Sequence, residues 1–526
     1  MYYTKVVTES KKNCKRVHDW IKMYSWLLIS GTIFGIAVFF LQISQSLVNS
    51  YDGIWNTSVY FADYWERSIG RWFWPYLDKL RFGTVSVPFN SILTLILVAI
   101  ASAFLLDLFQ VKKKGYSFLV CALFVASPLI GNSLSYGYMS PTFGMAYLLG
   151  ILSMFCAIRV SRTVPAILTG SAFLAFSMGC YQAYFGVACI VALIWVINKL
   201  FHDVNWKEFG NTLIRVGGTL LGGGLLYKIL LDIVLKIYQM ELSDYRGASE
   251  ISITSIILNL PQEIKLTYRD FYRCFFTDFT QNTTWIRKIY LVLFVFGVIW
   301  LLYRLIKVVK MNMVKGLLAV FLILCIPIAC NATLIITVEE GSSLLMTGGM
   351  TLFLPLLLCM MEKSKDGKAL VLVNVVLMCA VLWVNICIVN NDQIALQEGR
   401  SSTYTLAKSI ADRIQDEGWV LDGQTEVLLV GRPSENPFFK QTNAWKRAND
   451  YAAFGRWWVD PGNNRRSWQG VFDQCGIQLL MLNDYERNME VLNGEKIKEM
   501  ECFPSKNSIS VINDVVVVKV SEGYVF

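Results

Sequence analysis

Acidic and basic side chains gather in one short stretch between two long apolar runs. Residues 49–72 (NSYDGIWNTSVYFADYWERSIGRW) carry three carboxylates and two guanidinium groups: Asp52, Asp63, Glu66, Arg67 and Arg71. A guanidinium group can hold a phosphate, and positive charge matters most when that phosphate is a leaving group. A carboxylate beside it can act as a general base toward a hydroxyl group. The alternatives are an Asp63–Arg67 ion pair exposed to solvent and the binding of anionic lipid headgroups.

A second charged stretch repeats the basic pattern. Residues 260–276 (LPQEIKLTYRDFYRCFF) carry three basic residues spaced four positions apart: Lys265, Arg269 and Arg273. This spacing predicts one face of a helix, and Pro261 suits the first turn of that helix. Apolar residues recur at helical spacing here and in residues 54–72. We therefore predict two amphipathic helices in the same outer membrane interface, each with a basic stripe.

The composition is that of a polytopic membrane protein. Of the 526 residues, 55% are hydrophobic and 17% are charged, and the mean hydropathy is +0.46; soluble domains have about 25% charged residues. The formal net charge of +9 could suggest a nucleic-acid partner. However, the Lys and Arg residues mostly flank apolar runs, where they set membrane topology. We expect a lipid bilayer around the chain and no nucleic-acid partner.

About eleven apolar segments approach the length of about 20 residues that a membrane-spanning helix needs. They are residues 24–47, 87–108, 117–131, 142–158, 163–180, 182–198, 213–235, 289–303, 316–337, 344–361 and 369–389. The basic residues before the first segment, with the runs VKKKG, RVSR and RLIKVVK, predict a multi-pass plasma-membrane protein whose N-terminus is cytoplasmic. Within the seventh segment, Lys228 and Asp232 are four residues apart, a spacing that predicts either an ion pair or two residues that line a cavity.

The polar C-terminal part predicts a small α/β domain. TLAKSIADRIQDEGW, residues 405–419, predicts an amphipathic helix, and EVLLVG, IQLLML and VVVVKV predict strands. The spans place this domain outside the cell, and it carries no G-x-G-x-x-G, P-loop or Ser-His-Asp signature.

The predicted fold is thus an α-helical polytopic membrane protein with two parts. A transmembrane domain covers residues 1–389 and bears the charged external loops 49–86 and 236–288, and an extracytoplasmic α/β domain covers residues 390–526. The external turn 131–141 (GNSLSYGYMSP) is polar and aromatic, and could line a sugar site. With two His, and 13 Cys that form no C-x-x-C pair, the sequence predicts no structural zinc site.

The layout resembles that of integral-membrane glycosyltransferases of the GT-C class, and most of all the Gtr-type O-antigen glucosyltransferases, which modify bacterial surface polysaccharides. The resemblance covers most of the chain, including the acidic first external loop and the external C-terminal domain. The family usually has an Asp-Asp pair early in that loop, followed by Gly-Arg. Here the matching segments are YDG, with Asp52 alone, and SIGRW, with Gly70 and Arg71. Either Asp63 or Glu66 could stand in for the missing second carboxylate.

The resemblance implies transfer of a sugar, usually glucose, from a polyprenyl-phosphate donor to a surface glycan acceptor. It implies that Asp52 is the general base, that the anomeric centre is inverted, and that Arg67 and Arg71 hold the leaving phosphate. Further phosphate ligands could come from the second basic stretch: Lys265, Arg269 or Arg273. Some GT-C relatives use a divalent metal, and nothing in this sequence demands one.

Two other functions fit the same membrane architecture. A transporter or flippase of lipid-linked sugars would use the arginines to grip headgroups, but it should have polar residues along a path within the spans, and this sequence offers few. A non-enzymatic assembly factor would bind a partner through the external domain. For that function, removal of the Asp52 charge should have no effect.

Overall fold

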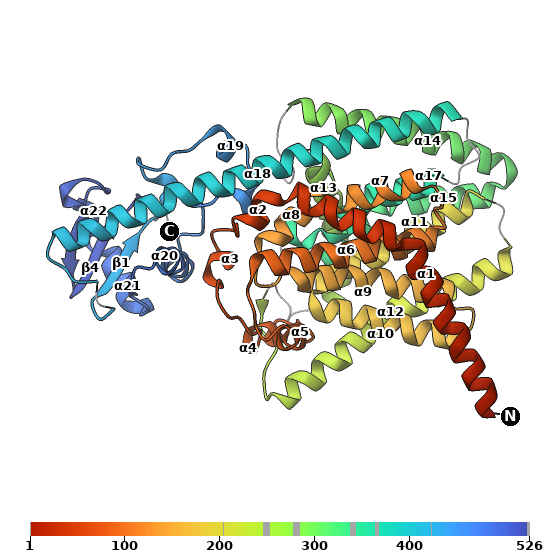
Figure 1. Ribbon diagram of the computed structural model, residues 1–526, viewed down its shortest axis with the longest axis horizontal. Helices are drawn as coiled ribbons and strands as arrows, with labels where there is room; N and C mark the ends of the chain where they lie inside the picture. The colour runs from red at the N-terminus through yellow and green to blue at the C-terminus, as the bar shows by residue number, and fades with distance from the viewer. Residues whose placement is uncertain are drawn as a thin grey trace.

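A computed structural model describes residues 2–202, 205–245, 253–276, 284–336, 343–362, 368–421 and 423–522. It shows a bundle of long helices joined to a smaller domain that contains a β-sheet (Figure 1). The N-terminus and the sheet lie at opposite ends of the long axis of the molecule (Figure 1). The long helices are α1 (Tyr2–Val38), α6 (Val87–Phe109), α9 (Ser140–Arg159), α10 (Thr163–Cys180), α11 (Phe185–Leu200), α12 (Trp206–Ile237), α13 (Ile253–Phe276), α14 (Thr284–Met311) and α18 (Lys368–Asp416).

Within the described ranges, seven helical segments are long and apolar enough to cross a membrane, or eight if one bent pair counts as a span. Helix α6 illustrates why these segments form. Pro88 lies in its first turn, and Gln110 ends it with a left-handed φ of 55°. Its sequence is apolar on every side, which is typical of a helix surrounded by lipid and other helices. The chain is therefore a membrane protein.

The predicted count of about eleven spans is not confirmed, although each predicted segment contains helix. Segment 117–131 is split before Pro128 into two helices bent by 47°, because Pro128 has no amide hydrogen with which to extend α7 and instead begins α8. Segment 316–337 is also broken near a proline, and segment 24–47 is interrupted after Val38. The short elements are α2 (Phe40–Ser44), α7 (Lys114–Val125), α8 (Pro128–Ser135), η1 (Gln182–Tyr184), α15 (Met313–Leu324), α16 (Ile326–Cys330), η3 (Ala332–Ile336), η4 (Leu344–Met346) and α17 (Gly348–Glu362).

Of the two predicted interfacial helices, the first is wrong, whereas the second forms as part of an amphipathic helix that begins before Pro261. The first charged stretch folds into three short helices, α3 (Asp52–Trp55), α4 (Tyr64–Ser68) and α5 (Trp74–Leu80), and an isolated bridge joins Val59 to Thr84. The second stretch belongs to the longer α13, with Pro261 inside it. In Figure 1, α13 lies above α6 and α9, whereas α4 and α5 lie below them. Residues 246–252 and 277–283 of the second loop are outside the described ranges.

Helix α18 runs without a break from the bundle into the C-terminal part (Figure 1). The predicted helix 405–419 is its last portion, which ends at Asp416. Its apolar face, with Leu406, Ile410 and Ile414, packs against the sheet and α20. The Lys228–Asp232 ion pair on α12 also forms, with a separation of 2.7 Å.

The C-terminal sheet has the strand order β2-β1-β4-β3, with β1 parallel to both neighbours and β3 antiparallel to β4. Asn513 and Asp514 both have positive φ in the turn between β3 and β4, as a tight hairpin requires. The three predicted strands are confirmed, and β3 is additional. The elements are β1 (Glu426–Val430), η5 (Pro433–Glu435), α19 (Asn443–Lys446), η6 (Asp450–Ala452), α20 (Pro461–Cys475), β2 (Leu480–Met481), α21 (Tyr485–Asn493), α22 (Glu495–Glu499), η7 (Lys506–Ser508), β3 (Ile509–Ile512) and β4 (Val515–Lys519).

Candidate active site

A cavity of about 620 Å³ lies where the first charged loop meets the C-terminal domain. Its walls come from α3, α4, the segment before α5, the segment between α8 and α9, and α20. It is at the end of the bundle away from the N-terminus, where α3 and α20 are neighbours (Figure 1). The lining residues are Asp52, Trp55, Asn56, Tyr60, Trp65, Glu66, Arg71, Trp74, Tyr138, Arg465, Arg466, Gln469, Gly470 and Asp473.

Asp52 is the first residue of α3, and Asn49 fixes the backbone around it. The Asn49 Oδ1 atom accepts a hydrogen bond from the Gly53 amide at 2.9 Å, and its Nδ2 atom donates to Ser135 Oγ at 3.1 Å. The Asp52 carboxylate has no hydrogen bond or ion pair among the described residues. Burial raises the pKa of Asp52 to about 6, while Arg71 and Arg466 act in the opposite direction. A carboxyl group with this pKa suits a general base near neutral pH.

Arg71 reaches the cavity because Gly70 turns the chain at the end of α4. Gly70 has a φ of 85°, its amide donates to the Arg67 carbonyl at 2.9 Å, and the Arg71 amide donates to the Glu66 carbonyl at 2.7 Å. These two bonds form a Schellman motif, which favours glycine. The Arg71 guanidinium lies 4.4 Å from the centre of the Tyr181 ring. Its Nε atom is buried, without a hydrogen-bond partner in the part of the chain that the structure describes.

Glu66 also lines the cavity, but both of its oxygens are engaged. The Tyr60 hydroxyl donates to Oε1, and the Asp63 amide donates to Oε2 at 2.9 Å, which closes a capping box at the start of α4. Burial raises the pKa of Glu66. Of the two carboxylates that could replace the missing second Asp, Glu66 is the one inside the cavity.

Asp63 and Arg67 pair with each other and do not line the cavity. The Asp63 side chain is 75% exposed, while Arg67 is buried, with its guanidinium 4.1 Å from the centre of the Tyr238 ring. The Asp63–Arg67 ion pair therefore forms, but it is exposed to solvent only on the Asp63 side.

The basic residues of α13 lie elsewhere. Arg269 and Arg273 approach the buried carboxylate of Asp270, at 3.2 and 3.9 Å, and neither of them nor Lys265 lines the cavity. In contrast, the 131–141 segment supplies Tyr138, as its polar and aromatic composition suggested. Arg81 donates to the Tyr138 carbonyl at 2.9 Å and so holds this segment against the first loop.

Sequence reasoning missed Arg465 and Arg466, which α20 brings to the cavity from the C-terminal domain. The Arg466 guanidinium lies 5.5 Å from the centre of the Trp55 ring. Two adjacent arginines in a polar helix are a common surface pattern, so their presence is only a weak signal of a binding site. Their proximity to Asp52 depends on tertiary packing between segments more than 400 residues apart.

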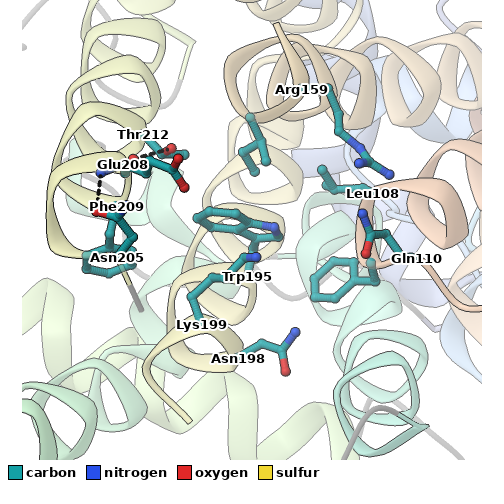
Figure 2. A pocket seen from close by; sticks show the side chains of 12 residues that line it. Leu108, Gln110, Arg159, Trp195, Asn198, Lys199, Asn205, Glu208, Phe209 and Thr212 are labelled. Atoms are coloured by element: carbon teal, nitrogen blue, oxygen red, sulfur yellow. Dashed lines mark hydrogen bonds between the residues drawn. The ribbon is translucent and has the colours of Figure 1, made fainter. Parts of the chain in front are cut away.

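A second cavity, of about 300 Å³, lies at the other end of the bundle, between the ends of α6, α9, α11 and α12. Figure 2 shows Trp195 between Arg159 and Gln110 on one side and Glu208 and Thr212 on the other. Arg159 pairs with Asp107 at 2.8 Å. The described lining of this cavity includes none of the predicted site residues, and the arginine in that lining is already paired, so we assign the chemistry to the first cavity.

The first cavity combines a free carboxylate with guanidinium groups and aromatic walls. Such a site can bind an anion, stack a sugar ring on the half-buried Trp55, and accept a proton from a hydroxyl group. Among the described residues, no group of three or more His, Cys, Asp or Glu side chains is placed to hold a metal ion.

Comparison with protein-family models matches residues 44–353 to the family described as Glucosyl transferase GtrII. Searches of curated proteins and of solved structures found no match. The family match includes Asp52, Gly70 and Arg71 and supports a glycosyltransferase activity with a sugar donor and an acceptor. Since the match spans more than half of the chain, the protein belongs to the Glucosyl transferase GtrII family.

Proposed function

We propose that this chain transfers glucose from a polyprenyl-phosphate carrier to a cell-surface polysaccharide, with inversion at the anomeric carbon. One observation carries the proposal: the Asp52 carboxylate, which has no hydrogen bond or ion pair within the described ranges, shares a cavity with the guanidinium of Arg71. A donor with a lipid tail, a charged phosphate and a sugar needs such a site at the end of a membrane bundle. The apolar bundle would accommodate the tail, and the cavity the phosphate and sugar.

The reaction needs one proton transfer and one displacement. Asp52 takes the proton of the acceptor hydroxyl as its oxygen attacks the anomeric carbon. The bond between that carbon and the phosphate oxygen breaks, and the electron pair leaves with the polyprenyl phosphate. Arg71 faces the charge that develops on this leaving group, and stabilises it most in the transition state. A single displacement inverts the configuration at the anomeric carbon.

We further propose that the cavity faces the outside of the plasma membrane and that the N-terminus is cytoplasmic. The basic residues of the N-terminal segment support this orientation. Helices α3 and α20, which line the cavity, and the sheet lie at the end of the bundle opposite the N-terminus (Figure 1). The proposed arrangement is a transmembrane domain over residues 1–389, followed by an extracytoplasmic domain over residues 390–526.

The test is transfer of labelled glucose from synthetic polyprenyl-phosphate-glucose by the purified full-length chain. Asp52→Asn should lower kcat about 10²- to 10⁴-fold, the usual contribution of a general base. Asp412→Asn is the matched control, because Asp412 is an exposed residue of α18 that does not line the cavity. The control should keep the wild-type rate.

Two outcomes would contradict parts of the proposal. Equal activity of Asp52→Asn and the wild type would move the base to another group, with Glu66 the next carboxylate in the cavity. No transfer by the wild type from any polyprenyl-phosphate sugar would refute the enzymatic reaction and favour transport of lipid-linked sugars.

A further inference from the structure

The cavity is incomplete without the C-terminal domain. The family match ends at residue 353, yet one wall of the cavity consists of residues on α20, more than 100 positions later in the chain. This wall contributes two guanidinium groups, Arg465 and Arg466. No hydrogen bond or ion pair engages either side chain within the described ranges.

Direct contacts fix α20 against α3, so the two arginines have a defined place relative to Asp52. The Trp55 Nε1 atom donates to Ser467 Oγ at 2.9 Å. A Cβ atom added at Gly470 would lie 2.5 Å from the Ile54 carbonyl oxygen, so only glycine allows this close approach. These contacts join α3 to the middle of α20.

Apart from Asp52, the carboxylates of the cavity accept hydrogen bonds from neighbouring groups, which leaves the guanidinium groups available to an anion. Glu66 is engaged by Tyr60 and by the Asp63 amide, and Asp473 accepts a hydrogen bond from Gln469 at 2.8 Å. Burial lowers the pKa of Arg465, and repulsion from the neighbouring Arg466 lowers it further. A bound anion would relieve this repulsion.

We infer that Arg465 and Arg466 bind the phosphate of the polyprenyl-phosphate donor from the side opposite Arg71, so that the C-terminal domain supplies part of the donor site. The inference rests on the proposed function, and it adds a substrate-binding role for a domain beyond the family match. Guanidinium groups suit this role because each can donate two parallel hydrogen bonds to phosphate oxygens.

The experiment measures equilibrium binding of farnesyl phosphate, a short polyprenyl phosphate, to the full-length chain in detergent. The variants are the double substitutions of Arg465 and Arg466 to Ala and to Lys, with Arg447→Ala as the control. Arg447 is an exposed arginine of the same domain and does not line the cavity. The double Ala variant should bind at least about tenfold more weakly, since each hydrogen bond to a charged group contributes about 1.5–3 kcal/mol.

The double Lys variant should bind with intermediate affinity, because it keeps the charge but loses the paired donors. Wild-type affinity in the double Ala variant would overturn the inference. Equal weakening by Ala and Lys would also overturn it, because the loss would then come from a misplaced α20. Binding needs no turnover, so a wild type that binds farnesyl phosphate but transfers no glucose would refute the proposed reaction and leave only the binding of polyprenyl phosphate by the two arginines standing.

Discussion

The proposed base makes transfer depend on pH in a defined direction. Burial raises the pKa of Asp52 from its usual value to about 6. A general base works only when deprotonated, so kcat/KM should rise as the pH rises through about 6 and level off above it. An unperturbed Asp, with a pKa of about 3.9, would give no change across this range.

The size of the effect follows from the titration curve. With a pKa of about 6, the Asp52 carboxyl is about 90% deprotonated at pH 7 and about 10% deprotonated at pH 5. We therefore expect kcat/KM to fall about tenfold between pH 7 and pH 5. The donor is a phosphodiester, which does not titrate in this interval, so the change reports the enzyme.

The assay is transfer from synthetic polyprenyl-phosphate-glucose at low donor concentration, from pH 4.5 to pH 8. Glu66 is the competing explanation for such a profile, because burial raises its pKa as well. Glu66→Gln should therefore keep the rise near pH 6. A flat wild-type profile between pH 5 and pH 7, or a rise that disappears in Glu66→Gln, would refute the assignment of the base to Asp52.

Three substitutions test how the cavity is built. Gly70→Ala puts a side chain on a residue with a φ of 85°, which costs about 1–2 kcal/mol. The substitution should displace Arg71 and lower the kcat of glucose transfer more than tenfold. Gly470→Leu collides with the Ile54 carbonyl and should separate α20 from α3, seen as faster proteolysis of the C-terminal domain together with lost transfer. Asp392, a buried carboxylate on α18, accepts three hydrogen bonds from Asn449 and Tyr451. Asp392→Ala should destabilise the fold by about 3 kcal/mol and lower the melting temperature in detergent.

The sequence predicted where helices and strands occur better than it predicted how many cross the membrane. Hydrophobic periodicity marks each apolar segment, but it does not show whether a segment is continuous. Pro128 splits one predicted span into a bent pair, and Pro327 lies where another is broken. Three of the four strands of the C-terminal domain are predictable because their apolar runs are short and bounded by polar residues.

The candidate site was partly predictable for a local reason. Asp52, Glu66 and Arg71 lie within 20 residues of one another, and one loop gathers them. The helical spacing of Arg67 and Arg71 suggested one shared face, but α4 ends at Ser68 and Gly70 reverses the chain, so their side chains point to different places.

The distant contribution of α20 could not be read from spacing at all, and it has a consequence for the base. Arg71 and Arg466 both lower the pKa of Asp52 in the ligand-free protein. A donor phosphate bound between them would cancel part of their positive charge, so the pKa of Asp52 should be higher in the donor complex. The pH profile of kcat reports the complex, while that of kcat/KM reports the free enzyme. The kcat profile should therefore rise at a higher pH than the kcat/KM profile, and coincident profiles would show that the phosphate does not bind between these two arginines.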